Sequence, residues 1–247
     1  MLRGSEFFYR LDLAPTPFLF LTFDREAVII RGKIGGIPMV TPSKLLFDRA
    51  HRKSVYNIQP ISNVPSVIEH GILSYQCAEA LQHESIAMQD VQSKRADVCI
   101  PNGKPLHSYA NAYFDPRNPM MYKRQQDAEN LCVLAVAATI LDLPGVIVSD
   151  GNAASRYSRF YAPADGIQKL DFVTVYCEWW TSEDWLDQQR KKRIKCAEIL
   201  VPDAIPYEYI IGAITVSEQA KETLQAQGFQ KEIVIRPRVF FRKEDDS

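Results

Sequence analysis

Short apolar runs dominate the hydrophobic pattern of the chain, and they predict strands and helices in mixed order. Strands are expected at 55–58, 110–114, 146–148, 172–176, 194–201 and 233–235. The longest apolar stretch, residues 128–141, predicts a buried helix that ends before Pro144 and Gly145. Because these elements do not alternate as regular βαβ units, the pattern favours an α+β fold over a doubly wound sheet.

Three further helices are predicted from the residues that begin and end them. Each begins at a side chain that can cap free amide groups, namely Asn63, Ser182 and Ser217. Gly71 and Gly228 suit the ends of the first and third helix, and the second ends in the cationic run 190–193. Weak periodicity over 85–108 predicts a long ordered loop.

The N-terminal segment differs in character from the rest of the chain. Residues 1–50 mix proline, glycine and short apolar runs, and 28–30 and 38–40 are expected to pair as a small hairpin around Gly35 and Gly36. We therefore expect an N-terminal extension over residues 1–50 and one main domain over residues 51–247, a size that can bury a core.

Composition limits the classes of function. The chain has 247 residues, 46% of them hydrophobic and 24% charged, with a formal net charge of −1. A nucleic-acid role would need a local basic patch, because there is no global positive field. The apolar run at Phe18–Leu21 is too short to cross a membrane, and no signal peptide is evident, so a cytoplasmic location and no membrane partner are expected.

The cysteines and histidines do not form a recognisable metal motif. Five cysteines are present, an odd number, and none forms a CxxC pair. A structural zinc site normally needs such close pairs, so free thiols and no metal are expected. The four histidines are scattered, and no GxSxG nucleophile elbow occurs.

Glu198 is the most informative charged residue. Alternation over 194–201 places it on one face with Ile194, Cys196 and Leu200. A carboxylate on an apolar face is costly unless it is paired, and costly charges concentrate at functional sites. The alternative is a half-solvated glutamate on an edge strand, and the pattern alone favours this alternative.

Two cationic features can each be interpreted as structural or as ligand-binding. Residues 190–195 suit either a solvated helix end or a phosphate-binding rim beside Glu198. Arg95 could form a surface ion pair with Asp90 or Asp97, or it could bind a pyrophosphate through two parallel hydrogen bonds. The residues alone favour the first interpretation in both cases.

Five segments, taken together, resemble one family, the DarT DNA ADP-ribosyltransferase toxins. They are YNIQPISNVPSVIEHGILS (56–74), IAMQDVQSKR (86–95), YFDPRNPMMY (113–122), SDGNAA with RFY (149–154 and 159–161) and CAEILVP (196–202). Their order and spacing agree with the family over about residues 54–240. Residues 1–50 lie outside the resemblance.

The resemblance implies an ADP-ribosyltransferase fold, in which an NAD cleft opens between the halves of a split mixed β-sheet with flanking helices. It implies transfer of ADP-ribose from NAD, a co-substrate, to a thymine base in single-stranded DNA. It also implies the role of a toxin that is controlled by a macrodomain antitoxin able to remove ADP-ribose.

The resemblance also assigns residues. Glu198 is implied as the catalytic glutamate, and Arg95 as the arginine at the NAD pyrophosphate that also helps to deprotonate the base. The remaining cofactor residues are implied to be Asn57, Ile58 and Gln59 at the nicotinamide end, Ser66 and Ser74 beside NAD, and Tyr113 and Met120 near the nicotinamide and the incoming base. The resemblance places the DNA face within 152–198. Because single-stranded DNA needs positive charge and stacking surfaces, its contacts are expected there at Asn152, Tyr157, Phe160, Lys191, Lys192 and Arg193.

One departure from the family bears on activity. The family usually has histidine where this chain has Asn57, and threonine where it has Gln59. Asparagine still donates and accepts hydrogen bonds. Three alternatives follow: an active thymine-modifying enzyme, an enzyme that modifies another base or RNA, and a module that retains the fold but has impaired catalysis.

Overall fold

The computed structural model describes residues 33–34, 37–38, 40–79 and 89–242. The chain divides into two compact units, residues 1–39 and 40–247. In the first unit, β1 (Lys33–Ile34) pairs antiparallel with β2 (Ile37–Pro38). The predicted strand at 28–30 lies outside the described residues.

The second unit contains an eight-stranded mixed sheet in the order β12-β11-β6-β3-β5-β9-β7-β8. Its strands are β3 (Ser54–Pro60), β5 (Tyr109–Tyr113), β6 (Leu131–Ala137), β7 (Ile147–Ser149), β8 (Phe160–Tyr161), β9 (Glu198–Pro202), β11 (Ile210–Thr215) and β12 (Glu232–Ile235). Neighbours pair antiparallel except β11 and β12, which are parallel. A separate pair joins β4 (Ile72–Leu73) to β10 (Ala204–Ile205).

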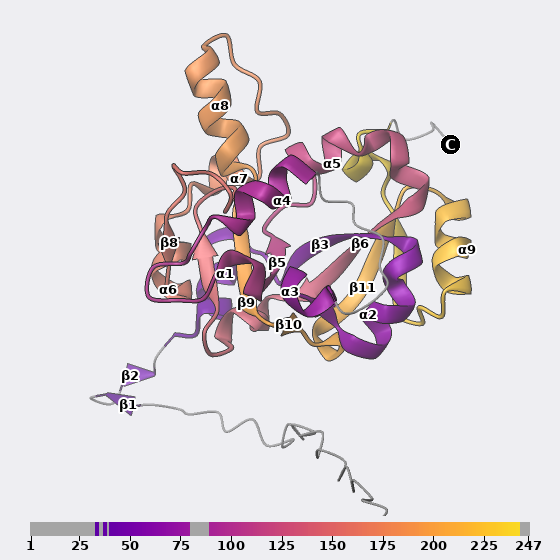
Figure 1. Ribbon diagram of the computed structural model, residues 1–247, viewed down its shortest axis with the longest axis horizontal. Helices are drawn as coiled ribbons and strands as arrows, with labels where there is room; N and C mark the ends of the chain where they lie inside the picture. Colours follow the sequence, from indigo (N-terminus) through magenta and orange to yellow (C-terminus); the bar gives the residue numbers. More distant parts are fainter. Residues whose placement is uncertain (1–32, 35–36, 39, 80–88, 243–247) are drawn as a thin grey trace, which may run out of the picture. The chain divides into compact units, whose positions relative to one another are not determined.

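The sheet is split between β3 and β5. These strands share a single registered pair, Tyr56 with Tyr113, whereas β3 pairs with β6 along its whole length from Ser54 to Pro60. The two halves therefore diverge, and Figure 1 shows β3, β6 and β11 on one side and β5 and β9 on the other. The predicted α+β fold with a split mixed sheet is confirmed.

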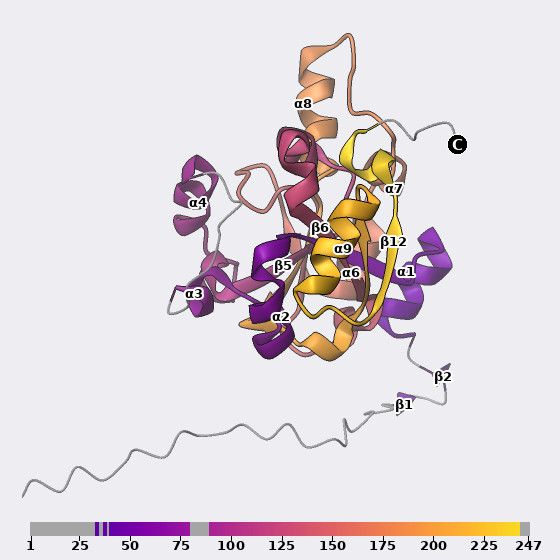
Figure 2. The same cartoon turned by 90° about the vertical axis from the view of Figure 1, so that its right-hand side faces the viewer.

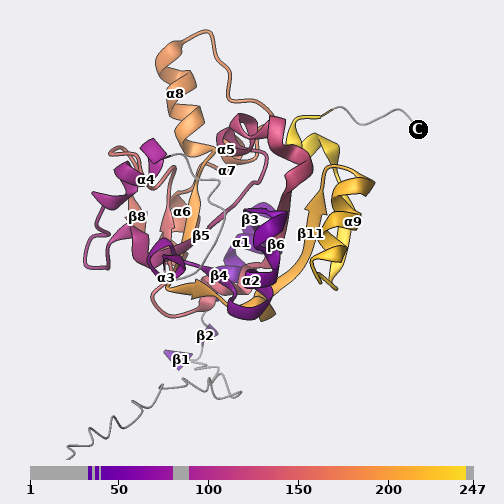
Figure 3. The same cartoon turned by 45° about the vertical axis from the view of Figure 1, so that its right-hand side comes forward.

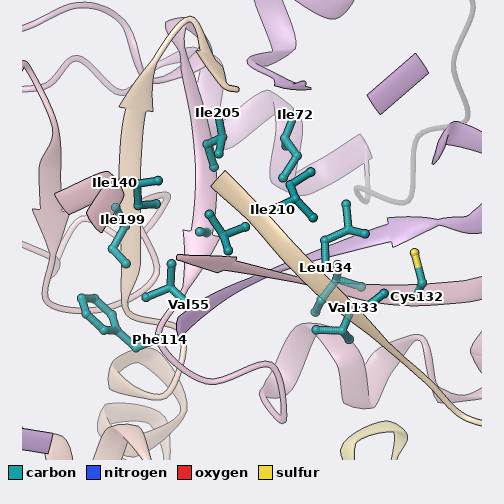
Figure 4. Close-up of a cluster of buried hydrophobic side chains, with 14 of the residues drawn as sticks. Val55, Ile72, Phe114, Cys132, Val133, Leu134, Ile140, Ile199, Ile205 and Ile210 are labelled. Atoms are coloured by element: carbon teal, nitrogen blue, oxygen red, sulfur yellow. The ribbon is translucent and has the colours of Figure 1, made fainter. Parts of the chain in front are cut away.

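Short helices surround this sheet. They are α1 (Pro42–Ala50), α2 (Val64–His70), α3 (Tyr75–Ala78), α4 (Gln89–Ala96), α5 (Pro119–Lys123), α6 (Pro163–Lys169), α7 (Phe172–Val175), α8 (Trp185–Ile194) and α9 (Glu218–Ala226). Helix α9 packs over β6, β11 and β12 (Figure 2), and α8 projects away from the body (Figure 1). The core in Figure 4 is apolar and joins strand residues from both halves, including Val55, Val133 and Ile199.

Two sequence-based assignments are wrong. The apolar run at 128–141 is the central strand β6, flanked by the 3-10 turns η3 (Gln125–Asn130) and η4 (Ala138–Asp142). A strand covered on both faces is apolar at consecutive positions, so its pattern imitates a buried helix. The predicted strand at 172–176 is helix α7, where the Asp171 carboxylate accepts from the Thr174 amide at 3.1 Å and from its hydroxyl at 2.7 Å.

Several boundaries also differ from the expectation. The predicted loop at 85–108 contains α4 and the 3-10 turn η2 (Leu106–Ser108), and the sequence pattern assigned no element to β11. The cap of α8 is Asp184 rather than Ser182, and Asn63 precedes α2 without a capping hydrogen bond from its side chain. Ile194 ends α8, so the strand carrying Glu198 begins at Glu198 itself.

The second unit begins at Val40, earlier than the expected boundary at residue 51. Helix α1 packs against η4 and α6, and its Leu46 is fully buried. The Ser43 amide donates to Asp142 Oδ1 at 2.9 Å, and Arg49 donates to the carbonyl of Ile167. Residues 40–50 are therefore part of the main fold.

Candidate active site

A cleft of about 920 Å³ opens where the two halves of the sheet separate. Its walls come from β3, α2, β5, α5 and α8, with Arg95 of α4 and Glu198 of β9. Helix α3 contacts β5, and Figure 3 shows α5 and α8 above them. The cleft thus combines residues that are up to 141 positions apart, between Asn57 and Glu198.

Glu198 is held inside the cleft as a buried, compensated carboxylate. It opens β9, between Tyr113 of β5 and Ser149 of β7, and only 1% of its surface is exposed. Its Oε1 accepts from the Ala153 amide at 2.9 Å, and its Oε2 accepts from Arg95 Nη1 at 3.1 Å. These partners offset the cost of burying the charge, and they fix the orientation of the carboxylate.

The Glu198 carboxylate helps to raise the pKa of two neighbouring groups. Burial, followed by the nearby negative charge of Glu198, raises the pKa of the Tyr113 phenol. The same two causes raise the pKa of the Cys196 thiol to about 12. Near neutral pH both groups remain protonated, so Tyr113 can donate a hydrogen bond and Cys196 is not a nucleophile.

Arg193 positions the loop that supports Glu198. Its Nη1 donates to Asp150 Oδ1 at 2.8 Å and to Ser158 Oγ at 3.3 Å. A Cβ at Gly151 would lie 2.5 Å from Arg193 Nη1 and 3.0 Å from its carbonyl oxygen, so only glycine allows this approach. Because Ala153 lies in the same loop, the contact orients the amide that holds Glu198.

Asn57 presents an unsatisfied acceptor in the cleft wall. The residue is 5% exposed, and its Nδ2 donates to the Asn111 carbonyl at 2.9 Å. Its Oδ1 is buried and has no hydrogen-bond partner among the residues that the structure describes. Since buried polar atoms are normally paired, this oxygen is suited to a donor from a bound ligand.

Most of the predicted site residues meet in this cleft. The lining includes Asn57, Ile58, Gln59, Ser66, Arg95, Tyr113, Met120, Asn152, Tyr157, Lys192, Arg193 and Glu198. Three predicted residues lie outside the lining. Ser74 caps α3 by accepting from the Cys77 amide, Phe160 packs against a small apolar cluster, and Lys191 pairs with Asp187 at 2.6 Å.

The structure adds cleft residues that the sequence reading did not identify. Tyr109 and Asn111 share a face of β5 with Tyr113, a period-two signal that could have identified them. Tyr75 and His107 line the cleft with ring centroids 4.3 Å apart. Trp185 and Leu186 at the start of α8 are exposed apolar side chains on its rim, and only the fold places them there.

Two further observations concern the described part of the chain. None of its helices is long and apolar enough to cross a membrane. Within the same residues, no three side chains of histidine, cysteine, aspartate or glutamate gather in a way that could hold a metal ion.

A split mixed sheet with a buried glutamate and an arginine in its central cleft defines an ADP-ribosyltransferase-like protein. The family model described as "ssDNA thymidine ADP-ribosyltransferase, DarT" matches residues 56–241, and the chain belongs to this family. The match covers most of the second unit, including every residue of the cleft named above.

Individual relatives agree with this family. A DNA ADP-ribosyl transferase–DNA ADP-ribosyl glycohydrolase fusion protein of Thermosipho africanus is 33% identical over 171 residues, which is 67% of this chain. The alignment spans only 43% of that fusion protein. A DNA ADP-ribosyl transferase of Thermus sp. is 26% identical over 77% of this chain and 94% of its own length.

Solved structures show the same fold. Thermosipho africanus DarTG in complex with ADP-ribose has a TM-score of 0.68 at 30% identity, covering 77% of this chain and 52% of that one. Thermus sp. 2.9 DarT in complex with ADP-ribosylated single-stranded DNA has a TM-score of 0.65 at 23% identity, covering 76% and 96% of the two chains.

Proposed function

We propose that this chain transfers ADP-ribose from NAD to a thymine base in single-stranded DNA, with Glu198 as its catalytic carboxylate. The observation that carries the proposal is Glu198 itself, 1% exposed in a large cleft and oriented by Arg95 and the Ala153 amide. Family membership and the fold support the same reaction.

The geometry suits cleavage of a glycosidic bond. Breaking the bond between nicotinamide and ribose generates positive charge on the sugar, as in glycoside hydrolysis. A fixed carboxylate at Glu198 stabilises that charge without reorganising in the reaction. A nitrogen of the base then bonds to the sugar carbon and loses its proton, and nicotinamide leaves. Arg95 is the cation that holds the pyrophosphate in this arrangement. Its positive charge also helps the base to release its proton to water, because it stabilises the negative charge that develops on the base.

The nicotinamide end of NAD is placed against β3. Asn57 Oδ1 is a buried acceptor without a partner among the described residues, and the carboxamide of nicotinamide carries a matching N–H donor. Ile58 and Gln59 form the adjacent wall, with Ser66 beside them on α2. Met120 of α5 also lines the cleft, and we place the incoming base beside it.

The DNA is placed along α8 and the loop that carries Asn152 and Tyr157. Lys192 and Arg193 supply positive charge on the cleft lining, and Tyr157 is 67% exposed, which leaves its ring accessible to a base. An unpaired strand avoids the cost of extracting a base from a duplex.

Glu198→Gln tests the proposed role of the carboxylate. Incubation with NAD and a thymine-containing oligonucleotide, followed by mass spectrometry, should show one added ADP-ribose for the unaltered protein. The variant keeps the shape but loses the charge, so kcat should fall by about 100- to 1000-fold. The KM for NAD should change far less. Glu208→Gln, at an exposed position outside the cleft lining, is the control.

Asn57 is the observation behind the two alternative functions. Oligonucleotides that lack thymine, and RNA of the same sequence, test for a different base or substrate in the same mass measurement. A catalytically impaired module would show little product with any of them. Asn57→His would then raise turnover by an order of magnitude or more, whereas a comparable rate in both proteins supports an active enzyme.

A toxin that modifies DNA requires a reversing partner. We infer that a macrodomain protein able to remove ADP-ribose controls this chain, and the Thermosipho fusion of a transferase with a glycohydrolase supports this inference. We place the pair in the cytoplasm, where NAD and single-stranded DNA are both present. Adding a macrodomain glycohydrolase to the modified oligonucleotide should restore its original mass.

A further inference from the structure

A second, smaller hollow adjoins the cleft on the outer side of α5 and α8. It has a volume of about 340 Å³, and we call it the aromatic groove; its lining consists of Pro119, Tyr122, Lys123, Trp179, Trp180, Thr181, Gln188 and Lys192. Pro119, Lys123 and Lys192 also line the cleft, so the two hollows share an edge. Figure 3 shows the two helices that supply these shared residues, α5 and α8.

The groove contains a preformed aromatic platform. Trp179 is 48% exposed and Tyr122 is 43% exposed, whereas Trp180 is buried beneath them. The Trp180 ring lies 5.7 Å from Tyr122 and 6.2 Å from Trp179, measured between centroids. The two exposed rings are therefore held by a packed layer rather than by mobile chain.

Arg117 packs against the rings of the platform and holds them in place. Its guanidinium carbon lies 4.8 Å from the Trp179 ring centroid and 3.9 Å from that of Phe241, and an Nη1 hydrogen bond to the Arg238 carbonyl anchors it. Phe241 in turn packs at 5.1 Å from Tyr122. The rings keep their orientation without a ligand, which lowers the entropic cost of stacking a base on them.

The charge of the groove selects a polyanion. Its lining residues, all in the described part of the chain, include two lysines and no carboxylate. Two acidic residues are adjacent in sequence to the lining, and both are paired: Glu178 with Arg238 at 2.8 Å and Asp187 with Lys191 at 2.6 Å. Exposed aromatic faces beside lysines are the combination that binds single-stranded nucleic acid with little sequence preference.

We propose that the aromatic groove binds the nucleotides that flank the target base on the same DNA strand. This inference rests on the proposed function. The strand enters from the cleft across the edge formed by Lys123 and Lys192, and its next bases stack on Tyr122 and Trp179 while those lysines face its phosphates. The groove thereby lengthens the DNA site beyond the residues around Glu198 without reading sequence.

Binding measured without NAD tests the groove independently of the reaction. Fluorescence anisotropy would compare an oligonucleotide of about four nucleotides with versions extended on the 5′ or the 3′ side. The unaltered protein should bind one extended version about tenfold more tightly, as expected for one stacked base. Trp179→Ala should abolish that gain, whereas Phe47→Ala, which removes a 40%-exposed ring on α1, should retain it.

A second variant removes no packing. Thr181→Glu adds a carboxylate at an exposed groove position. This variant should reduce the gain in affinity that extension gives. The reduction should be larger at low salt, because fewer ions are then present to screen the repulsion between the carboxylate and the phosphates. Thr181→Gln is its uncharged control.

The outcomes separate the two proposals. If extension strengthens binding and Trp179→Ala removes the effect, but no oligonucleotide gains mass, the reaction proposal fails and the groove remains. If extension gives no gain in the unaltered protein, or if Trp179→Ala and Thr181→Glu retain the gain, the groove does not bind DNA. Loss of antitoxin binding in those two variants, with unchanged DNA binding, would assign the platform to a protein partner instead.

Discussion

At the scale of single residues, the site depends on how one carboxylate is buried. Removing Glu198 from water would be prohibitive alone, but the Arg95 guanidinium at 3.1 Å and the Ala153 amide at 2.9 Å replace its hydration. Burial and the nearby charge of Glu198 keep the neighbouring thiol of Cys196 neutral.

The cysteines give a test of this environment. Burial raises the pKa of Cys132 and, with the charge of Glu198, that of Cys196, in each case to about 12. Because these pKa values are raised, little thiolate forms at either cysteine until the pH approaches 12. Iodoacetamide near pH 8 should therefore leave both cysteines unmodified in the folded protein. Exposed Cys77 and Cys99 should react, as peptide mass mapping would show. Rapid alkylation of Cys196 would contradict the assigned environment.

At the scale of elements, a buried ion pair joins three segments near the active site. Lys195, which follows α8 and is fully buried, pairs with Asp115 after β5 and donates to the Val175 carbonyl of α7 at 3.0 Å. The pattern of residues 194–201 predicted a continuous strand. The chain instead turns at Lys195, because this cation finds its partners only in the folded state.

Lys195→Met should therefore destabilise the protein. It leaves Asp115 without its cation, so the free energy of unfolding, measured by urea denaturation, should fall by about 3–5 kcal/mol. The double variant Lys195→Met with Asp115→Leu should recover part of this loss, because no unpaired charge remains. Lys44→Met, which breaks an exposed pair with Asp48, should change stability by about 0.5 kcal/mol or less. Equal effects of the two single variants would show that the buried pair contributes little.

At the scale of the whole molecule, the chain consists of two compact units that meet in sequence at residues 39 and 40. The family match begins at residue 56, and the fold begins earlier, with α1. Composition placed this boundary near residue 50 because residues 1–50 mix proline, glycine and short apolar runs. Its single fully buried residue, Leu46, becomes recognisable only when its packing partners are known.

Two truncations distinguish these boundaries. Residues 40–247 should retain the thermal stability and kcat of the full chain, because this truncation keeps the whole of the second unit. The truncation to residues 51–247 should lower the free energy of unfolding by about 2–5 kcal/mol. The site of Leu46 is then left empty, and Asp142 loses its hydrogen-bond partners in α1. Calorimetry would show this as a lower melting temperature. Identical stability of the two truncations would place α1 outside the fold.

The sequence by itself determined the elements whose signals are local. The strand at β3, the helices α2 and α9 with their glycine ends, and the fold class follow from alternation, caps and resemblance. It also identified Glu198 and Arg95, because five ordered segments supplied a context that no single residue carries.

Only the tertiary structure decided the remainder. A seven-residue apolar run becomes the strand β6 because β3 and β11 pair with its two edges, and the Val-Thr-Val run of α7 becomes helical because Asp171 caps it. The fold also forms the cleft and the aromatic groove from residues far apart in the chain. It likewise leaves the Asn57 oxygen without a partner among the described residues. Local patterns record what each segment prefers, whereas burial and partner atoms depend on neighbours that only the fold brings together.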